Sequence, residues 1–563
     1  MFRKRTSQER FWETLPGLQF WSVFFGAILL SYYRPIWAAM FIICFDLYWV
    51  LKAINTASHL WSAYKKFQSF VKIHWIRHAE QLIDIPMMLN FLQTKLASAQ
   101  DKTEKKYFKN EIAKIVLLLK KGVKSLDFLG YYHLILVPFV NESFEVLDST
   151  VSALAGAEYP RKKIILVLAS EDRAGEQAQI IAEKIKQKYT LDFFRIFIAK
   201  HPDGLPGEIK GKSANASFAV RSVLPNLKQL GIAVEKVLVS NFDSDTIVHP
   251  QYFAKVIYEF LTAEKPYNSS YQPIAVYNNN IWDSPALIRV ISVSNSFWQF
   301  TESSRPDRLR TFSSHTMPLK TLIDVGFWKK DIVNEDGFIF WQCYLHFKGD
   351  YRVVPLFIPI SLDTCLAPTT WQTLKNQYKQ KRRWAYNVEY YPHLVPKLLK
   401  LKAPLYDKLY KLFQYMEGNF NWATASLMIS TLGWLPLFLG GNRFNESVVA
   451  LNLPLITKTL MNVALFFLIF SVYINLILLP PRPKKYSVWR SVAMYLQWFL
   501  VPLASVIFGS IPAIEAQTRL MFGRYLEFWV TPKARFGENT GLTMKGMKVA
   551  TVANDKLPIT NNK

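Results

Sequence analysis

Long apolar segments at both ends of the chain restrict its fold more than any other feature. Two lie near the N-terminus, at residues 18–33 and 36–54, and three lie near the C-terminus, at residues 422–439, 455–479 and 488–510. Helices of about 17 to 25 apolar residues are long enough to cross a bilayer. No small-residue cleavage site separates the first two segments, so a membrane hairpin is favoured over a signal peptide. The chain is therefore predicted to be a multi-pass integral membrane protein.

Basic residues predict which side of the membrane each part occupies. Four of the first ten residues are Lys or Arg, and the loop at residues 480–485 carries three more basic residues. By the positive-inside rule, both regions and the part between the apolar blocks are expected in the cytoplasm. Five complete spans would place the basic tail from Arg519 onward outside, against the same rule. The last apolar segment, interrupted by Pro502 and Pro512, is therefore interpreted as an incomplete span.

Strand-like and helix-like segments alternate between the apolar blocks. Strands are predicted at residues 131–140, 163–169, 193–199 and 237–239, with helices at residues 144–157 and 175–189. This alternation predicts an α/β domain with a mostly parallel, doubly wound, Rossmann-like sheet. Ligands bind such a sheet beyond the carboxyl ends of its strands.

The length of 563 residues exceeds one ordinary domain. We divide the chain into an N-terminal tip with two spans (1–54), basic amphipathic interfacial helices (55–130), the α/β domain (131–400), an interfacial helix (401–421), about three membrane segments (422–515) and a basic tail (516–563). The formal charge of +26 is attributed to contacts with membrane lipids and phosphate. No nucleic-acid partner is predicted, because the sequence contains no recognisable nucleic-acid-binding module.

Two carboxylates, Asp243 and Asp245, follow the strand predicted at residues 237–239. Hard oxygen ligands at this edge of the sheet suit Mg²⁺ or Mn²⁺ bound to a diphosphate. Such a pair alone is more often a turn or a helix cap. Upstream, a Gly-rich turn carries Lys212 into the next helix. Its glycine spacing does not fit a nucleotide-binding P-loop, but a lysine at a helix start is a sensible phosphate contact.

Two later motifs each have a structural and a functional interpretation. Glu335 and Asp336 stand at the start of a predicted helix, where acids either complement the helix dipole or act as a general base. Residues 380–384 combine basic side chains with a tryptophan, which suits either lipid head groups or a phosphate beside a stacking surface. Between the Asp243–Asp245 pair and the Glu335–Asp336 pair, residues 278–315 match no known pattern. Aromatic residues there, including Trp298, are expected to pack in the core rather than stack on a sugar.

Taken together, five ordered motifs resemble those of the membrane-integrated family 2 glycosyltransferases, which include cellulose and hyaluronan synthases. The motifs are Pro138, Asn141 and Glu142 for P-x-x-N-E, Lys212 and Asn215 for G-K-x-x-N, Asp243 and Asp245 for D-x-D, Asn334, Glu335 and Asp336 for T-E-D, and Gln380, Arg383 and Trp384 for Q-x-x-R-W. The resemblance covers residues 131–386 and extends to the apolar segments on both sides.

The resemblance implies a GT-A fold in a cytoplasmic domain inserted between transmembrane helices, and an enzyme that inverts the anomeric centre in one displacement. It assigns Asp243 and Asp245 to the metal, Mg²⁺ or Mn²⁺. It also makes Asp336 the catalytic base, with Glu335 beside it. Donor contacts are implied for Pro138, Asn141, Glu142, Lys212, Asn215, Asp243 and Arg383, and acceptor contacts for Gln380 and Trp384.

The chain departs from the family pattern after the second predicted strand. The family usually has an Asp-rich turn there that contacts the nucleobase, whereas this chain has Ser170, Glu171, Asp172 and Arg173. Either Glu171 or Asp172 is expected to take that role. The choice of a UDP-sugar as donor depends on this substitution.

Three classes of function follow from these patterns. The first is a transferase that moves sugar from a nucleotide donor to a polysaccharide, with export, or alternatively adds one sugar to a lipid acceptor. The second is a transporter with a nucleotide-binding domain, which the failed P-loop disfavours. The third is a noncatalytic scaffold. A polymer synthase is preferred because a full Q-x-x-R-W motif occurs between membrane segments.

Overall fold

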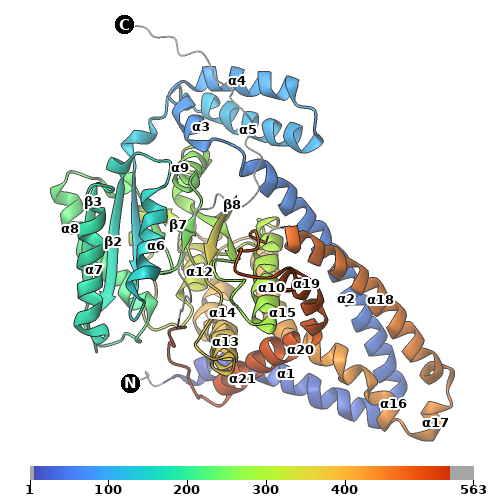
Figure 1. The fold of residues 1–563 in the computed structure, drawn as a ribbon. Helices are drawn as coiled ribbons and strands as arrows, with labels where there is room; N and C mark the ends of the chain where they lie inside the picture. The colour runs from blue at the N-terminus through green and yellow to red at the C-terminus, as the bar shows by residue number, and fades with distance from the viewer. Residues whose placement is uncertain (1–4, 478, 533–563) are drawn as a thin grey trace.

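The computed structural model describes residues 5–477 and 479–532. Its centre is an eight-stranded sheet with the order β3-β2-β1-β4-β7-β6-β8-β5 (Figure 1). The strands are β1 (Tyr132–Pro138), β2 (Ile164–Glu171), β3 (Arg195–His201), β4 (Val237–Asn241), β5 (Ile247–Val248), β6 (Ser269–Tyr277), β7 (Thr316–Pro318) and β8 (Arg352–Leu362).

The sheet has a parallel half and a mixed half. Strands β3, β2, β1 and β4 pair in parallel, β7 joins β4 and β6 by antiparallel pairing, and β6 and β8 are parallel again. The short β5 closes the sheet antiparallel to β8. The predicted α/β class with a mostly parallel sheet is confirmed. The first four predicted strands lie where the structure has β1 to β4.

Helices cover both faces of the sheet. They are α6 (Phe144–Ala155), α7 (Gly175–Tyr189), α8 (Lys212–Gln229), α9 (Tyr252–Thr262), α10 (Ala286–Ser303), α11 (Leu319–Asp324), α12 (Glu335–His346), α13 (Thr370–Ala385) and α14 (Tyr391–Lys400). Alternation along β1 divides the core, because Leu134 and Leu136 pack with α8 and α12 while Ile135 and Val137 pack with α6, α7 and α9. The carboxyl ends of the strands remain accessible between these layers.

The N-terminal region begins with two long helices, α1 (Ser7–Tyr33) and α2 (Pro35–Phe70). Pro35 begins α2, where a missing N–H does no harm to the helix. Since α2 continues without a break to Phe70, the domain boundary expected after residue 54 falls inside a helix. The next three helices are α3 (Trp75–Gln81), α4 (Ile85–Ser98) and α5 (Lys102–Lys120), which pack against α9 beside the sheet (Figure 1).

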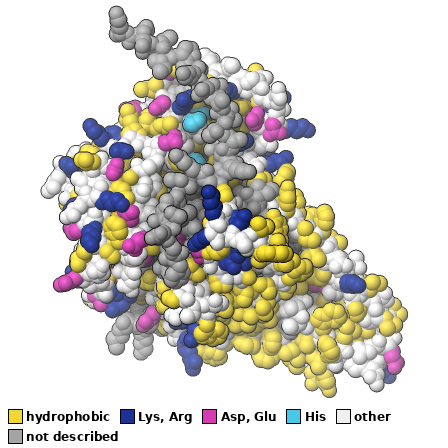
Figure 2. Space-filling model, in the orientation of Figure 1, with side chains coloured by type: hydrophobic (Ala, Val, Ile, Leu, Met, Phe, Trp, Pro, Cys, Tyr) yellow, Lys and Arg dark blue, Asp and Glu magenta, His cyan; other side chains and the backbone are white. Residues whose placement is uncertain are grey.

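The C-terminal region returns to long apolar helices. It contains α15 (Leu405–Ser430), α16 (Leu435–Leu439), α17 (Gly441–Asn445), α18 (Val448–Ile477), α19 (Val488–Leu496), α20 (Val501–Ser505) and α21 (Ile511–Met521). Figure 2 shows hydrophobic side chains spread over the region where α2, α16 and α18 extend away from the sheet. A surface of this kind suits contact with lipid.

Four candidate membrane spans occur among the described residues: Ser7–Tyr33, Pro35–Phe70, Val448–Ile474 and Val488–Met521. The expected span at residues 422–439 is absent from this set. Those residues are divided between the end of α15, a 3-10 turn at Leu432–Trp434 and the short α16, so no single helix is long enough. Among the described residues, four helices, rather than the five segments expected, are therefore candidates to span the membrane.

The last candidate span is not a regular helix. A π-turn at Val506–Ser510 joins α20 to α21, and Pro502 and Pro512 stand on either side of it. Such breaks weaken the i to i−4 hydrogen bonding of a helix. The basic residues expected at positions 3 and 4, and the tail residues 533–563, lie outside the described residues.

Candidate active site

A cavity of about 760 Å³ lies at the carboxyl ends of the strands. It is lined by three groups of residues from the sequence motifs: Pro138, Glu142, Glu171, Lys212 and Asn215; Asp243, Asp245, Glu335 and Asp336; and Gln380, Arg383 and Trp384. The structure therefore brings most of the predicted site residues to one cavity. Asn141 and Asp172 are the exceptions, because neither lines it.

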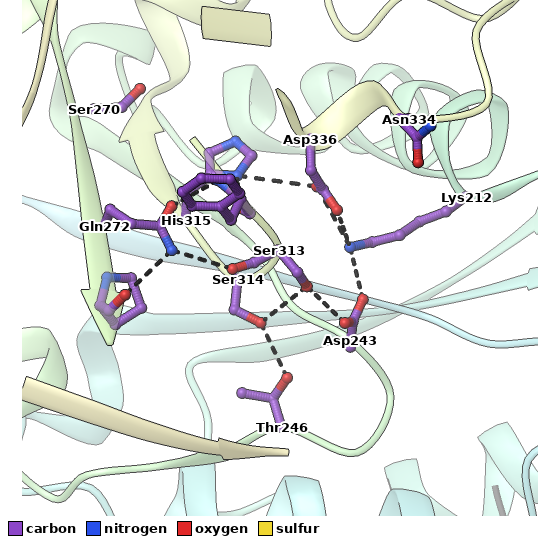
Figure 3. Close-up of polar contacts among 12 residues, drawn as sticks. Lys212, Asp243, Thr246, Ser270, Gln272, Ser313, Ser314, His315, Asn334 and Asp336 are labelled. Carbon is purple, nitrogen blue, oxygen red and sulfur yellow. Dashed lines mark hydrogen bonds and ion pairs between the residues drawn. The ribbon is translucent and has the colours of Figure 1, made fainter. Parts of the chain in front are cut away.

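The centre of the site is an ion-pair network around Lys212, the first residue of α8. Its ammonium lies 2.8 Å from Asp243 Oδ1 and 3.2 Å from Asp336 Oδ2 (Figure 3). Burial opposes the charge of Lys212, but the two carboxylates outweigh that effect and raise its pKa. Three elements, α8, the end of β4 and the start of α12, thus place opposite charges together.

The start of α12 holds the adjacent acids in different environments. Asp336 faces the cavity beside Lys212, whereas Glu335 is only 3% exposed and its Oε1 has no hydrogen-bond partner among the described residues. Burial, and next the neighbouring Asp336 carboxylate, raise the pKa of Glu335 to about 8. Glu335 is therefore suited to remain a neutral acid at neutral pH beside the Asp336 carboxylate.

This arrangement predicts a pH effect on stability for Glu335→Gln. An unfolded Glu loses its proton near pH 4.5, whereas folded Glu335 keeps it until about pH 8. The native wild-type protein therefore loses stability as pH rises through this window, and the variant does not. We expect equal thermal midpoints near pH 4.5 and a higher midpoint for the variant at pH 8.5, measured in detergent. Glu176→Gln, on the exposed side of α7, is the control, and a constant difference at all pH values would contradict the prediction.

The two aspartates of the D-x-D motif are held differently. Asp243 accepts hydrogen bonds from Lys212 and from Ser313, the latter at 2.6 Å. Asp245 is 2% exposed, and its Oδ2 accepts a hydrogen bond from the Asp363 backbone N–H at 2.8 Å. Both aspartates of the motif therefore line the cavity, and different partners hold their carboxylates in place.

These carboxylates fit a divalent metal only with help from a substrate. Among the described residues, no cluster of three or more His, Cys, Asp or Glu side chains is arranged to bind a metal. Mg²⁺ commonly takes one or two carboxylates and completes its shell with phosphate oxygens and water. Asp243 and Asp245 match that pattern, so they fit a metal that arrives with a diphosphate.

Lys212→Met should alter metal binding because Lys212 occupies Asp243 Oδ1. Without the competing ammonium, Mn²⁺ alone should bind about tenfold more tightly, equivalent to ~1.4 kcal/mol. Titration calorimetry in the absence of nucleotide measures this. Lys210→Met is a matched control, since Lys210 pairs with Asp203 at the surface, 2.9 Å away. Unchanged or weaker Mn²⁺ binding in Lys212→Met would contradict Asp243 as a ligand.

At the substituted base-binding turn, the two candidate acids point to different places. Glu171 lines the cavity, and its carboxylate accepts hydrogen bonds from Arg173 Nε at 2.6 Å and Nη2 at 3.1 Å. Asp172 lies outside the cavity and pairs with Lys200 at 2.6 Å. Of the two acids, only Glu171 lines the cavity, since β2 ends at Glu171 and Asp172 begins a 3-10 helix. Asn141 is exposed nearby, whereas Asn215 donates to the Ala169 carbonyl at the end of β2.

The Q-x-x-R-W residues lie on α13 and meet the C-terminal segment. Gln380 donates to Thr531 Oγ1 at 3.3 Å, and the Arg383 guanidinium lies 4.7 Å from the Phe528 ring centroid. Phe528 also packs so close to Gly211 that a Cβ there would lie 2.8 Å from its ring. The Trp384 ring lies 6.1 Å from that of Tyr277 across the cavity.

Sequence reasoning missed several side chains that line the cavity or lie beside it. Ser313 and His315 come from the unplaced region 278–315, and His315 Nδ1 lies 4.0 Å from Asp336 Oδ1 (Figure 3). Ser314 between them has a positive φ of 64°, a conformation disfavoured for residues other than glycine. Trp298 is 46% exposed and lines the cavity, so it is not the core residue that was expected. The turn at Ser313 and Ser314 carries no local sequence pattern that would have marked it as part of the site.

Comparison with known proteins supports the class suggested by the motifs. Residues 238–511 match the family described as "Glycosyl transferase family group 2". This matched part extends from β4 through the D-x-D, Asn334–Asp336 and Q-x-x-R-W motifs into the C-terminal apolar helices, and over these residues it confirms the resemblance to family 2 glycosyltransferases. A search of curated protein sequences finds no significant match.

Two solved structures show what the chain resembles in three dimensions. The mannosyltransferase PcManGT from Pyrobaculum calidifontis, in complex with GDP-Man and Mn²⁺, is 14% identical, with 67% of this chain and 86% of that chain covered and a TM-score of 0.34. S. aureus TarS 1-349, in complex with UDP-GlcNAc, is 12% identical, with coverage of 70% and 93% and a TM-score of 0.33. These TM-scores are too low for the likeness to define the fold or the substrate.

Proposed function

We propose that this protein is a metal-dependent, inverting glycosyltransferase of GT-A type that uses a nucleotide sugar, a UDP-sugar in the first instance, to extend a polysaccharide. The observation that carries the proposal is the meeting of Lys212, Asp243 and Asp336 in one cavity, from three separate elements. Two of these residues lie in the part of the chain that matches family 2 glycosyltransferases. The ammonium of Lys212 between the two carboxylates provides the opposite charges needed to hold a diphosphate beside a base.

Each residue has a defined task in such a displacement. Asp336 accepts the proton of the acceptor hydroxyl, because its carboxylate faces the cavity. Asp243 and Asp245 would hold Mg²⁺ or Mn²⁺, which would supply positive charge to offset that of the leaving diphosphate. Arg383, which lines the same cavity, supplies planar hydrogen-bond donors for phosphate oxygens. Lys212 then serves as a counter-ion between the base and the diphosphate site.

The shape of the cavity supports an acceptor that approaches from the membrane. Trp49 and Lys52 of α2 and Trp422 of α15 line it, so it continues from the strand ends to the long apolar helices. Lys52 pairs there with Glu417 of α15. A growing polysaccharide can leave along this wall, which is the basis for proposing export. A lipid acceptor that receives one sugar would enter by the same route and is the alternative.

A basic loop that contacts the α/β domain favours a cytoplasmic catalytic domain. Trp282 Nε1 donates a hydrogen bond to the Pro480 carbonyl at 3.1 Å, and Lys485 pairs with Asp283 at 2.7 Å. The loop at residues 480–485 and the domain therefore lie on the same side, which the positive-inside rule makes the cytoplasm. Nucleotide sugars are cytoplasmic substrates, so this orientation agrees with the proposed donor.

The experiment that tests the function uses purified protein in lipid nanodiscs with Mg²⁺ or Mn²⁺ and radiolabelled UDP- and GDP-sugars. Labelled product of high molecular weight, formed from one donor and absent with Asp336→Asn, is the expected result. Label confined to the lipid extract would identify the lipid-directed alternative. Donor binding without transfer or hydrolysis for every sugar tested would contradict the enzyme and favour a noncatalytic scaffold.

A further inference from the structure

The loop at residues 328–334, which leads into α12 and delivers Asp336, is fastened at its first half to α8. Ser217 donates a hydrogen bond to the Trp328 carbonyl at 3.0 Å, and Ser213 donates to the Lys329 carbonyl. Just before α8, the Ile209 N–H donates to the Lys330 carbonyl at 3.0 Å. The same helix carries Lys212, so this half of the loop is anchored to the element that positions the Lys212 ammonium.

The second half of the loop is held by the turn that follows the Q-x-x-R-W helix, a 3-10 helix at Tyr386–Tyr390. Glu389 Oε1 accepts hydrogen bonds from the backbone N–H groups of Val333 at 2.9 Å and Asn334 at 3.0 Å. The Tyr390 hydroxyl donates to the Asn334 carbonyl. Asn334 in turn donates from Nδ2 to the Arg383 carbonyl at 2.8 Å.

These contacts replace the side-chain cap that usually stabilises the first turn of a helix. Asn334 is the N-cap residue of α12, yet its side chain makes no capping hydrogen bond to that helix. N-cap side chains normally bind the N–H groups of the first turn. Here the carboxylate of Glu389 binds the two N–H groups immediately before the helix instead. The orientation of the first turn, and with it the Asp336 side chain, therefore depends on a residue 53 positions later in the chain.

Close packing fits the same arrangement. A Cβ at Gly337 would lie 2.9 Å from the Tyr390 hydroxyl oxygen, so only glycine lets Tyr390 reach the Asn334 carbonyl. Burial raises the pKa of Glu389 to about 8, against the effect of its two backbone hydrogen bonds. A neutral carboxyl still accepts through its carbonyl oxygen. A glutamine at this position therefore preserves the two contacts.

We propose that Glu389 and Tyr390 are positioning residues that hold the 328–334 loop and thereby place the Asp336 carboxylate for proton transfer. The proposal rests on the proposed function in taking Asp336 as the base. Glu389 does not line the cavity, whereas Tyr390 does. In this proposal both act through the backbone of Val333 and Asn334. A displacement of about 1 Å in a reacting group can lower a rate 100-fold, so the contacts matter for turnover rather than for donor binding.

The kinetic test compares Glu389→Ala with Glu389→Gln and Tyr390→Phe. Glu389→Ala should lower kcat about 10- to 100-fold with an unchanged donor Kd. Glu389→Gln should recover most of kcat, since its amide oxygen accepts the same two hydrogen bonds. Tyr391→Phe is the matched control for Tyr390→Phe, because the Tyr391 hydroxyl has no hydrogen bond to this loop. A wild-type kcat in Glu389→Ala, or no recovery in Glu389→Gln, would overturn the proposal.

A double-mutant comparison shows whether the effect passes through the base. In an Asp336→Asn background, adding Glu389→Ala should reduce the residual rate no further, because the positioned carboxylate is already absent. Fully multiplicative losses would mean that Glu389 acts elsewhere and would overturn the proposal.

A structural measurement separates this proposal from the proposed function. Hydrogen exchange of the peptide covering residues 328–337 should speed up in Glu389→Ala and match wild type in Glu389→Gln, whatever activity the protein has. Unchanged exchange in Glu389→Ala would overturn the positioning role. Faster exchange in a protein that transfers no sugar would leave the positioning role intact and count against the proposed function.

Discussion

Asp336→Asn should abolish sugar transfer while leaving metal-dependent donor binding intact. Asparagine keeps the size of the side chain and can still accept a hydrogen bond from Lys212, which lies 3.2 Å from Asp336 Oδ2. It cannot take a proton from an acceptor hydroxyl. Removal of a general base lowers rates by roughly 100- to 10,000-fold, and a loss in this range is expected for kcat. Donor affinity, measured by calorimetry with Mn²⁺, should change by less than about threefold, or ~0.7 kcal/mol.

Asp350→Asn provides the control for this substitution. Asp350 follows the other end of α12 and pairs with Lys265 at the surface, 2.6 Å away, so the same chemical change there should leave transfer unaffected. Transfer at the normal rate by Asp336→Asn would show that another group is the base. Glu335 and His315 are the nearest candidates, because both adjoin Asp336.

Most of the parallel half of the sheet could be predicted from sequence because β1, β2 and β4 are largely apolar runs. Every residue of β2 and β4 is buried, which is the pattern expected when helices cover both faces. The mixed half could not be predicted in the same way. Strands β5 and β7 have two and three residues, too few to show a period. They are defined only by their partners, which are β8 for β5 and both β4 and β6 for β7.

The membrane region shows a different limit. Residues 422–439 have the apolar composition of a span, yet the chain leaves the helix after Ser430 and forms short turns. Thr431 accordingly departs from helical geometry, with φ of −131°. Composition reports how apolar a segment is. It does not report the break after Ser430, which occurs in a helix, α15, that packs against α1 and the π-turn.

The motifs identified the residues of the site but not the contacts among them. Lys212 and Asp336 are 124 positions apart, and Ser313 is 70 positions from Asp243. No local pattern encodes such pairs, since they depend on how α8, β4 and α12 meet. Glu389 illustrates the same point, because a glutamate after a basic helix has no feature that links it to the loop before Asp336.

Asp245→Asn should remove metal-dependent donor binding, an effect opposite in kind to that of Asp336→Asn. Asp245 is held in place by the Asp363 N–H on its side chain and by Asn279 Nδ2, which donates to its backbone carbonyl at 3.1 Å. Asparagine can retain the contact with Asp363 through its amide oxygen, so the fold should survive. Alanine would leave a buried N–H unpaired, which costs about 1 to 3 kcal/mol and would confuse the result.

The measurement is donor affinity with Mn²⁺ and with a chelator. For the wild type, Mn²⁺ should tighten binding strongly, because a metal neutralises charge between the aspartates and the diphosphate. For Asp245→Asn, affinity with Mn²⁺ should fall about 100-fold, equivalent to ~2.8 kcal/mol, and approach the value in chelator. The two proteins should bind equally in chelator if the part of the cavity around Glu171 is undisturbed. Full Mn²⁺-dependent binding by Asp245→Asn would contradict its role as a ligand and leave Asp243 as the carboxylate that meets the metal.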